Sequence, residues 1–461
     1  MAFAQRGLKN ILQKYDNDVV ILSVLRTPIT RSYKGGLRNA YPEQMLAAVV
    51  RGILDRNPKL DPAAVSDIAV GTVLSELGGS KAGRMAMNHT GFPPTTSFYT
   101  VNRACASSLQ SFTTVASSIA LQQFDVGIAG GMESMTLNYG SKAIPTNYWP
   151  ELKDSPVKNA KDCVMSMGLT SENVAERYNV SREDQDAFGA ESHKRASQAQ
   201  RNGFFDDEIV PVKVSNPIGQ GEGAEKPDVQ TAETVLVDKD DGIRHNVSVE
   251  KMGTLKPVFK PDGRSTAGNS SQVSDGASAA LLMRRSTATS LGLSDSIIGK
   301  WVSSVCVGVA PDEMGIGPTV AIPALLSKTD ISKEDVGVWE INEAFASQAL
   351  YCIRKLGLDG KMDKINPNGG GIALGHPLGA TGTRQLATLM HEMGRQGEQV
   401  GVVILLSNRR VNTFPPSSSI LFNEREETNL KDLETTDHAG FNCHGQALPN
   451  FRNPSAGVIM G

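Results

Sequence analysis

The sequence predicts an α/β protein in which two similar α/β halves flank an inserted region. Short apolar runs rich in β-branched residues alternate with amphipathic helical stretches before about residue 138 and again after about residue 266. Between these limits the chain is polar and rich in Pro and Gly, which is typical of loops that surround helices. At 461 residues the chain is long enough for two or three domains.

In the first half, buried apolar runs predict strands and 3.6-residue periodicity predicts helices. The expected order is a strand at 18–28, a helix at 42–57, a strand at 65–74, a strand passing into a helix at 96–123, and a strand at 125–135.

The inserted region, 138–266, contains two helical stretches and one exposed loop, at 170–178, 182–203 and 216–233. The α/β pattern then returns. We expect an apolar segment at 277–285, a strand at 299–311, a helix at 320–329, a strand running into a helix at 336–357, a helix at 380–397 and a strand at 399–407.

After Ser407 the regular pattern stops. The segment 408–461 is Pro- and Ser-rich and then highly charged, and we expect it to be mostly disordered or loosely attached. Residues 417–422, "SSSILF", could add one edge strand. The predicted divisions are therefore 1–17, 18–285 with the insertion 138–266, 293–407, and 408–461.

Composition excludes several classes of protein. The net charge of −3 gives no basic field that would favour nucleic acid as the main partner. No apolar stretch approaches 18 residues, so we predict no membrane span. Five widely spaced cysteines without C-x-x-C favour neither a disulfide framework nor a zinc site, and we predict no metal.

Cys105 lies in "NRACASSLQSF", directly before a predicted helix rich in small residues. A cysteine at a helix N-terminus meets the positive end of the macrodipole, which favours the thiolate. Small neighbours would let a substrate approach the sulfur. Cys105 is therefore a candidate nucleophile, and the alternative is a packed core cysteine.

The segment Ile365–Gln385, "INPNGGGIALGHPLGATGTRQ", places six glycines around His376. A phosphate-binding loop would need G-x-x-x-x-G-K-[ST] or G-x-G-x-x-G, and neither is present. The loop is better interpreted as a rigid holder for the histidine. A neutral imidazole is the usual base for a thiol nucleophile, so we pair His376 with Cys105.

Two further polar residues lie at predicted strand ends. Asn342, in "INEAFASQAL", could either cap the following helix or orient a water toward a substrate oxygen. Glu133, in "GGMESM", is better explained by a structural hydrogen bond than by catalysis.

Five segments appear in the order and at the separations found in the thiolases: "VNRACASSLQS", "GGMESMT", "TAGNSSQVSDGAS", "EINEAFASQAL" and "GGGIALGHPLGATGTRQ". Over roughly residues 18–407 the chain resembles the 3-ketoacyl-CoA thiolases, particularly the peroxisomal type. The resemblance implies the thiolase fold, a layered α-β-α-β-α core with an inserted CoA-binding loop region. It also implies a homodimer or tetramer that uses coenzyme A as substrate and needs no other cofactor.

The resemblance also implies roles for individual residues. Cys105 matches the acylated nucleophile, His376 the histidine that activates it, and Asn342 the residue that holds an oxyanion-hole water. Ser271 matches a contact to the pantetheine arm of CoA, and Met167 and Phe345 match residues that line its tunnel.

The chain departs from the family after its last predicted core strand. Family members carry a C-x-G motif there, which supplies the acid/base cysteine and a backbone N–H for the second oxyanion hole. Here "GVV" is followed by "ILLSNRRVNTF". The next cysteine is Cys443, in "FNCHGQ", about 38 residues late. A changed reading frame, an unspliced segment or a genuine variant would each explain this departure.

The N-terminal segment is basic, amphipathic and free of acids before Asp16. Peroxisomal thiolases often carry R-[LVI]-x5-[HQ]-[LA], and Arg6 and Gln13 match this spacing whereas Gly7 and Lys14 do not. The segment favours peroxisomal import through an import receptor, with the mitochondrion or cytosol as alternatives. A plain surface helix is the other interpretation.

The expected activity is thiolysis of 3-ketoacyl-CoA to acetyl-CoA and a shortened acyl-CoA, as in fatty acid β-oxidation. Three alternative functions remain open from the sequence alone. They are a weakly active acyl-CoA-binding pseudoenzyme, motivated by the missing C-x-G, a biosynthetic thiolase that forms acetoacetyl-CoA, and a condensing ketosynthase. Ketosynthases share the fold but use two histidines, and Asn342 occupies the position of one of them.

Overall fold

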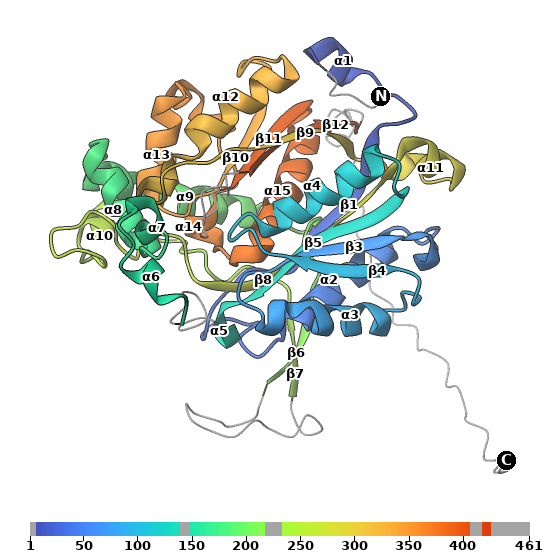
Figure 1. The fold of residues 1–461 in the computed structure, drawn as a ribbon, viewed down its shortest axis with the longest axis horizontal. Helices are drawn as coiled ribbons and strands as arrows, with labels where there is room; N and C mark the ends of the chain where they lie inside the picture. Colours follow the sequence, from blue (N-terminus) through green and yellow to red (C-terminus); the bar gives the residue numbers. More distant parts are fainter. Residues whose placement is uncertain (1–5, 139–146, 217–232, 406–416, 426–461) are drawn as a thin grey trace, which may run out of the picture. The chain divides into compact units, whose positions relative to one another are not determined.

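The computed structural model describes residues 6–138, 147–216, 233–405 and 417–425 (Figure 1). The described part has the α-β-α-β-α layering that the resemblance implies. The two halves of one continuous ten-stranded sheet lie on either side of a central layer of helices. The strands and helices that the hydrophobic periodicity predicts are present in both halves.

The sheet of the first half has the order β4-β3-β5-β8-β1. β3 is parallel to β4 and β5, whereas β8 is antiparallel to β5 and β1. A short strand, β2, adds to β8. The strands are β1 (Val19–Arg26), β2 (Thr30–Arg31), β3 (Asp67–Gly71), β4 (Ser97–Val101), β5 (Val126–Ser134) and β8 (Ser274–Arg284).

The sheet of the second half has the order β9-β12-β11-β10. It continues from the first sheet because Val19, Val20 and Ile21 of β1 pair antiparallel with residues 299–301 of β9. Its strands are β9 (Gly299–Cys306), β10 (Val338–Ile341), β11 (Val400–Leu405) and β12 (Ser417–Asn423).

Successive side chains of the strands pack on opposite faces of the sheet, and this alternation explains the layers. In β1, Val20 and Leu22 pack on the side of α2, whereas Val19 and Ile21 pack with α4 and α15. In β11, Val402 and Ile404 pack on the opposite side from Val403 and Leu405. Both faces of each sheet are therefore covered, as buried strands with continuous apolar runs require.

Three groups of helices fill the layers (Figure 1). The outer layer of the first half has α2 (Pro42–Arg56) and α3 (Ser80–His89), and the central layer has α4 (Ser107–Ala120) and α15 (Thr381–Gln396). The outer layer of the second half has α1 (Leu8–Leu12), α12 (Pro318–Thr329) and α13 (Ala346–Lys355). The shorter helices are α5 (Met135–Asn138), α11 (Arg285–Ser290) and α14 (Gly371–Leu374).

The inserted region is more regular than its composition suggested. It contains α6 (Pro150–Lys153), α7 (Lys158–Asp162), α8 (Met167–Arg177), α9 (Arg182–Arg201) and α10 (Val249–Gly253), together with the hairpin β6 (Val212–Asn216) and β7 (Glu233–Val237). Ser166 and Ser181 cap α8 and α9, because each side chain accepts a hydrogen bond from the first helical turn. Most of the exposed loop expected at 216–233 lies outside the described residues.

The end of the second sheet corrects one expectation. Residues 417–423 form an interior strand rather than an edge strand, because β12 pairs with β11 on one side and with β9 on the other. Ile420 and Leu421 are fully buried, and Arg285 binds Glu424 just beyond the strand. The regular fold therefore resumes after Ser407, and the expectation that 408–461 is loosely attached is wrong for 417–425. Residues 426–461 lie outside the described residues.

Candidate active site

Cys105 lies in a tight turn between β4 and α4 and is 5% exposed. Ala104 has a positive φ of 44°, which is a strained conformation for a residue with a side chain. Side chains stabilise the turn: Asn102 Oδ1 accepts a hydrogen bond from Ala104 N at 3.1 Å, and Ser107 Oγ accepts one from Arg103 N at 2.8 Å. The sulfur is therefore fixed one residue before the N-cap of α4, as the sequence predicts.

The other cysteines have different surroundings. Cys352 is fully buried, and burial raises the pKa of its thiol. Cys163 is half-buried, and Cys306 is exposed with its sulfur 2.7 Å from Arg103 Nη1. Cys443 lies outside the described residues, so its candidacy as an acid/base stays untested.

His376 is 4% exposed, and its backbone N–H and its ring are both held by hydrogen bonds. Its backbone N–H donates to Gln272 O at 3.0 Å, and its Nδ1 lies 2.6 Å from Thr381 Oγ1. Its Nε2 is buried without a hydrogen-bond partner among the described residues. Burial, aided by the charge of Arg384, lowers the pKa of His376 to about 3. The imidazole is therefore neutral at physiological pH and can accept a proton.

The backbone N–H groups of the glycine-rich loop donate to side chains of neighbouring segments. Gly379 N donates to Glu133, Gly370 N to Ser192 Oγ, and Ile372 N to Glu343. These groups are therefore already paired with protein acceptors, which leaves this loop poorly suited to cradle a phosphate. The glycines instead permit close packing: a Cβ on Gly370 would lie 2.6 Å from both carboxylate oxygens of Glu343.

We expect Gly370→Ala to destabilise the protein by about 1–3 kcal/mol, because the added Cβ overpacks against a buried, immobile carboxylate. It should also displace the loop and lower activity. Thermal unfolding and turnover measure both effects. Gly360→Ala is the matched control, since nothing lies within 4 Å of the Cβ it would add. Equal behaviour of the two variants would contradict this account of the loop.

Asn342 follows β10 and is 1% exposed. It does not cap α13, since Gln348 Oε1 accepts the N–H groups of Ala344 and Phe345 there. Its backbone N–H donates to Ile404 O, whereas both polar atoms of its side-chain amide are buried without a hydrogen-bond partner among the described residues. The capping interpretation is thus wrong, and the amide is available for another group.

Packing joins the segments that carry these three residues. The amide of Asn342 lies against Gly371, at the start of the α14 turn that leads to His376. After His376, the short 3-10 helix η7 (Leu378–Ala380) and the start of α15 pack on the N-terminus of α4, where Thr383 N donates to Ser108 Oγ at 3.0 Å. The turn carrying Cys105 and the loop carrying His376 therefore meet at the start of α4.

Ser271, Met167 and Phe345 also lie together. Ser271 N donates to Ala344 O at 2.9 Å, and Met167 and Phe345 both pack on Met314 and Ala344. Because Ala344 and Phe345 directly follow Asn342 and Glu343 in the chain, this apolar group lies beside the polar residues described above.

Sequence reasoning missed Glu343, which organises the loop. Its carboxylate accepts hydrogen bonds from Ser192 Oγ at 2.6 Å and Asn366 Nδ2 at 2.8 Å, in addition to Ile372 N. Only its position beside Asn342 could have indicated it, because Ser192 lies 151 residues away in the chain. Glu133, by contrast, makes the structural hydrogen bonds that we expected, to residues 72–74 and Gly379.

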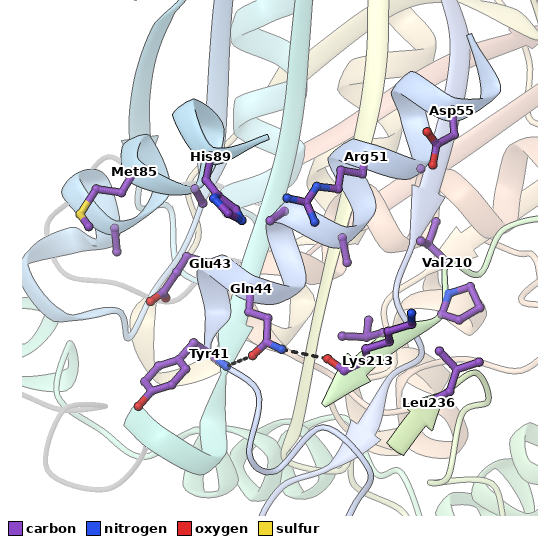
Figure 2. Close-up of a pocket in the computed structure, with 17 residues that line it drawn as sticks. Tyr41, Glu43, Gln44, Arg51, Asp55, Met85, His89, Val210, Lys213 and Leu236 are labelled. Atoms are coloured by element: carbon purple, nitrogen blue, oxygen red, sulfur yellow. Dashed lines mark hydrogen bonds between the residues drawn. The ribbon is translucent and has the colours of Figure 1, made fainter. Parts of the chain in front are cut away.

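A separate pocket of about 1030 Å³ lies among α2, α3 and β6 (Figure 2). Arg51, His89 and Lys213 point into it. α2 and α3 cover the outer face of the first sheet, whereas α4 covers the inner face, so the sheet separates this pocket from Cys105. It is not part of the site built around that residue.

Comparison with known proteins places the chain in a family. The model of the thiolase N-terminal domain matches residues 19–286, and that of the thiolase C-terminal domain matches residues 296–408. The chain belongs to the thiolase family. Among the parts of the chain that the structure describes, no helix has both the length and the apolar character needed to cross a bilayer.

Individual thiolases are similar over most of the chain. The peroxisomal 3-ketoacyl-CoA thiolase 2 of Arabidopsis thaliana is 47% identical over 396 residues, which cover 84% of this chain and 81% of that one. The peroxisomal 3-ketoacyl-CoA thiolase of Yarrowia lipolytica is 45% identical, with coverage of 86% and 92%. The crystal structure of the dimeric peroxisomal thiolase of Saccharomyces cerevisiae matches with a TM-score of 0.80 at 38% identity, covering 90% of this chain and all of that one.

Proposed function

We propose that the protein cleaves 3-ketoacyl-CoA with CoA, giving acetyl-CoA and an acyl-CoA two carbons shorter, as in fatty acid β-oxidation. One observation carries the proposal: the turn of Cys105 meets the loop of His376, and the end of β10 brings the amide of Asn342 against the same loop. The Nε2 of His376 and the amide of Asn342 are both buried and lack hydrogen-bond partners among the described residues. Buried polar groups without partners are costly, and they are found where a substrate supplies the missing partner. The named activity of the relatives supports the same reaction.

In the first half-reaction, His376 accepts the proton of the Cys105 thiol, and the thiolate attacks the 3-keto carbon of the substrate. Negative charge develops on the carbonyl oxygen, where His376 and a water held by Asn342 would stabilise it. The bond between C2 and C3 then breaks. Acetyl-CoA leaves as its enolate and takes up a proton, and the acyl group remains as a thioester on Cys105.

In the second half-reaction, the thiol of CoA loses its proton and attacks the acyl-cysteine. The thioester bond to Cys105 breaks, the shortened acyl-CoA leaves, and the cysteine is regenerated. Ser271, Met167 and Phe345 would hold the pantetheine arm, which needs one polar contact and an apolar wall. As proposed, the reaction needs no cofactor other than CoA as substrate.

A catalytically weak acyl-CoA-binding protein of the same fold is the second candidate. The observation that favours it is in the sequence, which has no cysteine between Cys352 and Cys443 and therefore no C-x-G motif directly after β11. Cys443 does begin a C-x-G, in "FNCHGQ", but about 38 residues late. The biosynthetic direction, in which two acetyl-CoA molecules condense, would use the same residues in reverse. A ketosynthase is less well supported, because Asn342 stands where a second histidine would be needed.

We further propose a homodimer located in the peroxisome. The dimeric state of the similar yeast thiolase and the location of the relatives support this. Residues 1–30 fused to a fluorescent protein should give punctate peroxisomal fluorescence, and Arg6→Ala should reduce it. Diffuse or mitochondrial fluorescence of the unaltered fusion would contradict import through this segment.

The activity itself is tested with the purified full chain, a 3-ketoacyl-CoA and CoA. Chromatography of the products should show acetyl-CoA and an acyl-CoA shorter by two carbons in equal amounts. An acyl adduct with about one acetyl-CoA released per chain, and no shortened acyl-CoA, would favour the second candidate. The absence of both adduct and products would contradict the proposal.

A further inference from the structure

A cavity of about 190 Å³ lies beside β1. On the side away from β8, β1 pairs with β9 through residues 19–21, and its next neighbour in the described structure is Ile209, opposite Arg26. The cavity runs along residues 22–25 between these two pairings, and the C-terminal end of α2 and the second half of α15 also line it. Its volume is several times the share of one water molecule in the liquid, about 30 Å³, so it has room for a small ion.

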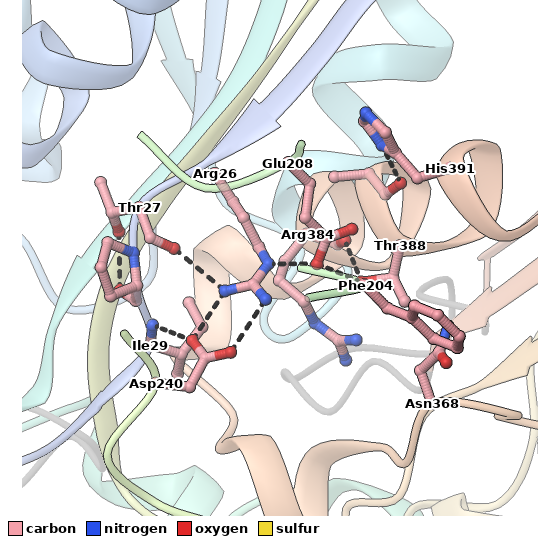
Figure 3. A network of polar contacts seen from close by, with 12 residues as sticks. Arg26, Thr27, Ile29, Phe204, Glu208, Asp240, Asn368, Arg384, Thr388 and His391 are labelled. Atoms are coloured by element: carbon pink, nitrogen blue, oxygen red, sulfur yellow. Dashed lines mark hydrogen bonds and ion pairs between the residues drawn. The ribbon is translucent and has the colours of Figure 1, made fainter. Parts of the chain in front are cut away.

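The arginines near this stretch of β1 are of two kinds. Arg26 is fully buried and fully paired: its Nε donates to Glu208 Oε1 at 2.6 Å, and its terminal nitrogens donate to Asp240 at 2.7 and 2.9 Å (Figure 3). Arg56 and Arg425, which line the cavity, have no such partners. Neither guanidinium forms an ion pair or a hydrogen bond with another residue that the structure describes.

The two unpaired arginines come from different elements and are exposed at the mouth of the cavity. Arg56 is in the last turn of α2, where a cation also offsets the negative end of the helix dipole. That explanation does not apply to Arg425, which follows β12 and lies against α15. A Cβ on Gly394 would be 3.1 Å from both Cδ and Nη1 of Arg425.

Neighbouring charges do not neutralise this pair of cations. Asp295, the acid among the lining residues, forms no ion pair with Arg56 or Arg425. Asp207 and Arg395 also act on Arg425, but with opposite signs. The mouth of the cavity therefore carries a net positive charge, which favours an anion.

The buried part of the cavity presents a hydrogen-bond acceptor. His391 is 3% exposed, and its Nδ1 donates to Ala387 O at 2.8 Å, so the neutral ring offers Nε2 as an acceptor. This nitrogen points away from Arg26 and Glu208 and has no partner among the described residues (Figure 3). Burial lowers the pKa of His391 to about 4, which keeps the ring neutral near physiological pH.

Asn57 and Ser23 are the other buried polar residues of the lining. Asn57 Nδ2 donates to Ser23 Oγ at 2.7 Å and to Ile53 O at 2.8 Å, whereas its Oδ1 is buried without a partner among the described residues. The hydroxyl of Ser23 accepts one hydrogen bond and keeps its own proton to donate. The cavity therefore has cationic donors at its mouth, and both a donor and acceptors inside.

We propose that this cavity binds a protonated phosphate group, either inorganic phosphate or a phosphomonoester. Arg56 and Arg425 bind its oxygens, and its O–H donates to Nε2 of His391. Water alone would satisfy the acceptors but would leave two unpaired cations at one cavity. Sulfate would pair with the cations but has no O–H near neutral pH. A phosphate group that keeps one proton matches both. None of the lining residues belongs to the candidate active site, so the proposal is independent of the proposed function.

Isothermal titration calorimetry of the full chain tests the proposal with inorganic phosphate and, separately, with sulfate at the same ionic strength near neutral pH. Phosphate should bind with a Kd of about 1 mM or below, and sulfate at least about tenfold more weakly. Charge attraction alone gives the opposite order, because sulfate carries the larger charge at this pH. Equal affinities, tighter binding of sulfate, or no binding of either ion would overturn the proposal.

Variants locate the bound ion. Arg56→Gln and Arg425→Gln should each weaken phosphate binding by about tenfold or more, because each removes a charge-assisted hydrogen bond. His391→Leu should lower the affinity for phosphate to that for sulfate. Arg51→Gln is the matched control, since Arg51 lies on the same helix as Arg56 but lines the separate pocket (Figure 2). This control should bind phosphate as the native chain does.

If Arg51→Gln weakens binding and the other two arginine variants do not, the ion lies in the other pocket and the proposal is overturned. If His391→Leu does not fold, the comparison of the two ions in the native chain and the variants of the two exposed arginines still decide. Binding is measured without turnover, so these results hold whether or not the protein catalyses thiolysis. Methyl phosphate then distinguishes the two sources of the group: an affinity equal to that of inorganic phosphate indicates a phosphomonoester, and much weaker binding indicates free phosphate.

Discussion

Replacing Cys105 with alanine should abolish thiolysis, with a loss of about 10⁴-fold or more in kcat, because no other group can form the acyl-enzyme. Mass spectrometry of the native chain after incubation with acyl-CoA should find one acyl group on the peptide that contains Cys105. The same experiment on Cys105→Ala should find none. Substrate binding should persist in this variant, since Ser271, Met167 and Phe345 are unchanged.

Cys163→Ala is the matched control for Cys105→Ala. Cys163 is half-buried at the end of α7, and its thiol donates to Asn159 O within its own helical turn. Its replacement should leave both the acyl adduct and turnover unchanged. An adduct on Cys163, Cys306 or Cys352 in the native chain would refute the assignment of the nucleophile.

Restoring a C-x-G motif should raise steady-state thiolysis by about 10²-fold or more, whereas the initial acylation burst should change little. The first attack uses Cys105, His376 and Asn342, which are all present. The second half-reaction needs a base for the CoA thiol and further N–H donors. A general base contributes about 10²–10⁴-fold and one oxyanion donor about 10²–10³-fold, although the two need not multiply.

The strand order shows where the motif should be introduced. β12 is already paired on both sides, so only the segment between Leu405 and Ser417 should be exchanged, at constant length. A second version with S-x-G in place of C-x-G keeps the glycine and removes the thiol, which separates the base from the N–H donor. If the native chain already turns over as fast as the C-x-G version, another group provides the acid/base, and Cys443 would be examined first.

The sequence was sufficient to predict the layered α/β fold and to identify the principal candidate catalytic residues. Strands such as β1 and β11 are continuous apolar runs, and their periodicity differs clearly from that of α2 and α15. Cys105 and His376 were identifiable because each residue type carries chemistry and each occurs in an unusual local context. In the structure Cys105 directly precedes α4, and the loop of His376 leads into η7 and α15, which pack on the start of α4.

Other features depend on contacts that no local pattern reveals. Whether Asn342 caps α13 depends on whether Gln348 already does so, and that is visible only in the structure. In the sequence, Arg384 cannot be distinguished from an exposed polar residue of a helix. Only the position of α15 in the central layer shows that Arg384 is buried. The interior position of β12 was missed for a similar reason. A short segment of serines and three apolar residues is typical of an edge strand, and only its pairing with β9 and β11 shows that it lies inside the sheet.

The interior position of β12 has a consequence for how the chain folds during synthesis. It is the last described strand to leave the ribosome, yet it fills the gap between β9 and β11. Until residue 423 has emerged, both of those strands expose unpaired backbone groups, and such edges invite pairing with other chains. The edge of β9 therefore stays unpaired from residue 306 until β12 begins at residue 417, and the edge of β11 joins it from residue 405. This half of the protein is the part that most needs protection by chaperones during synthesis.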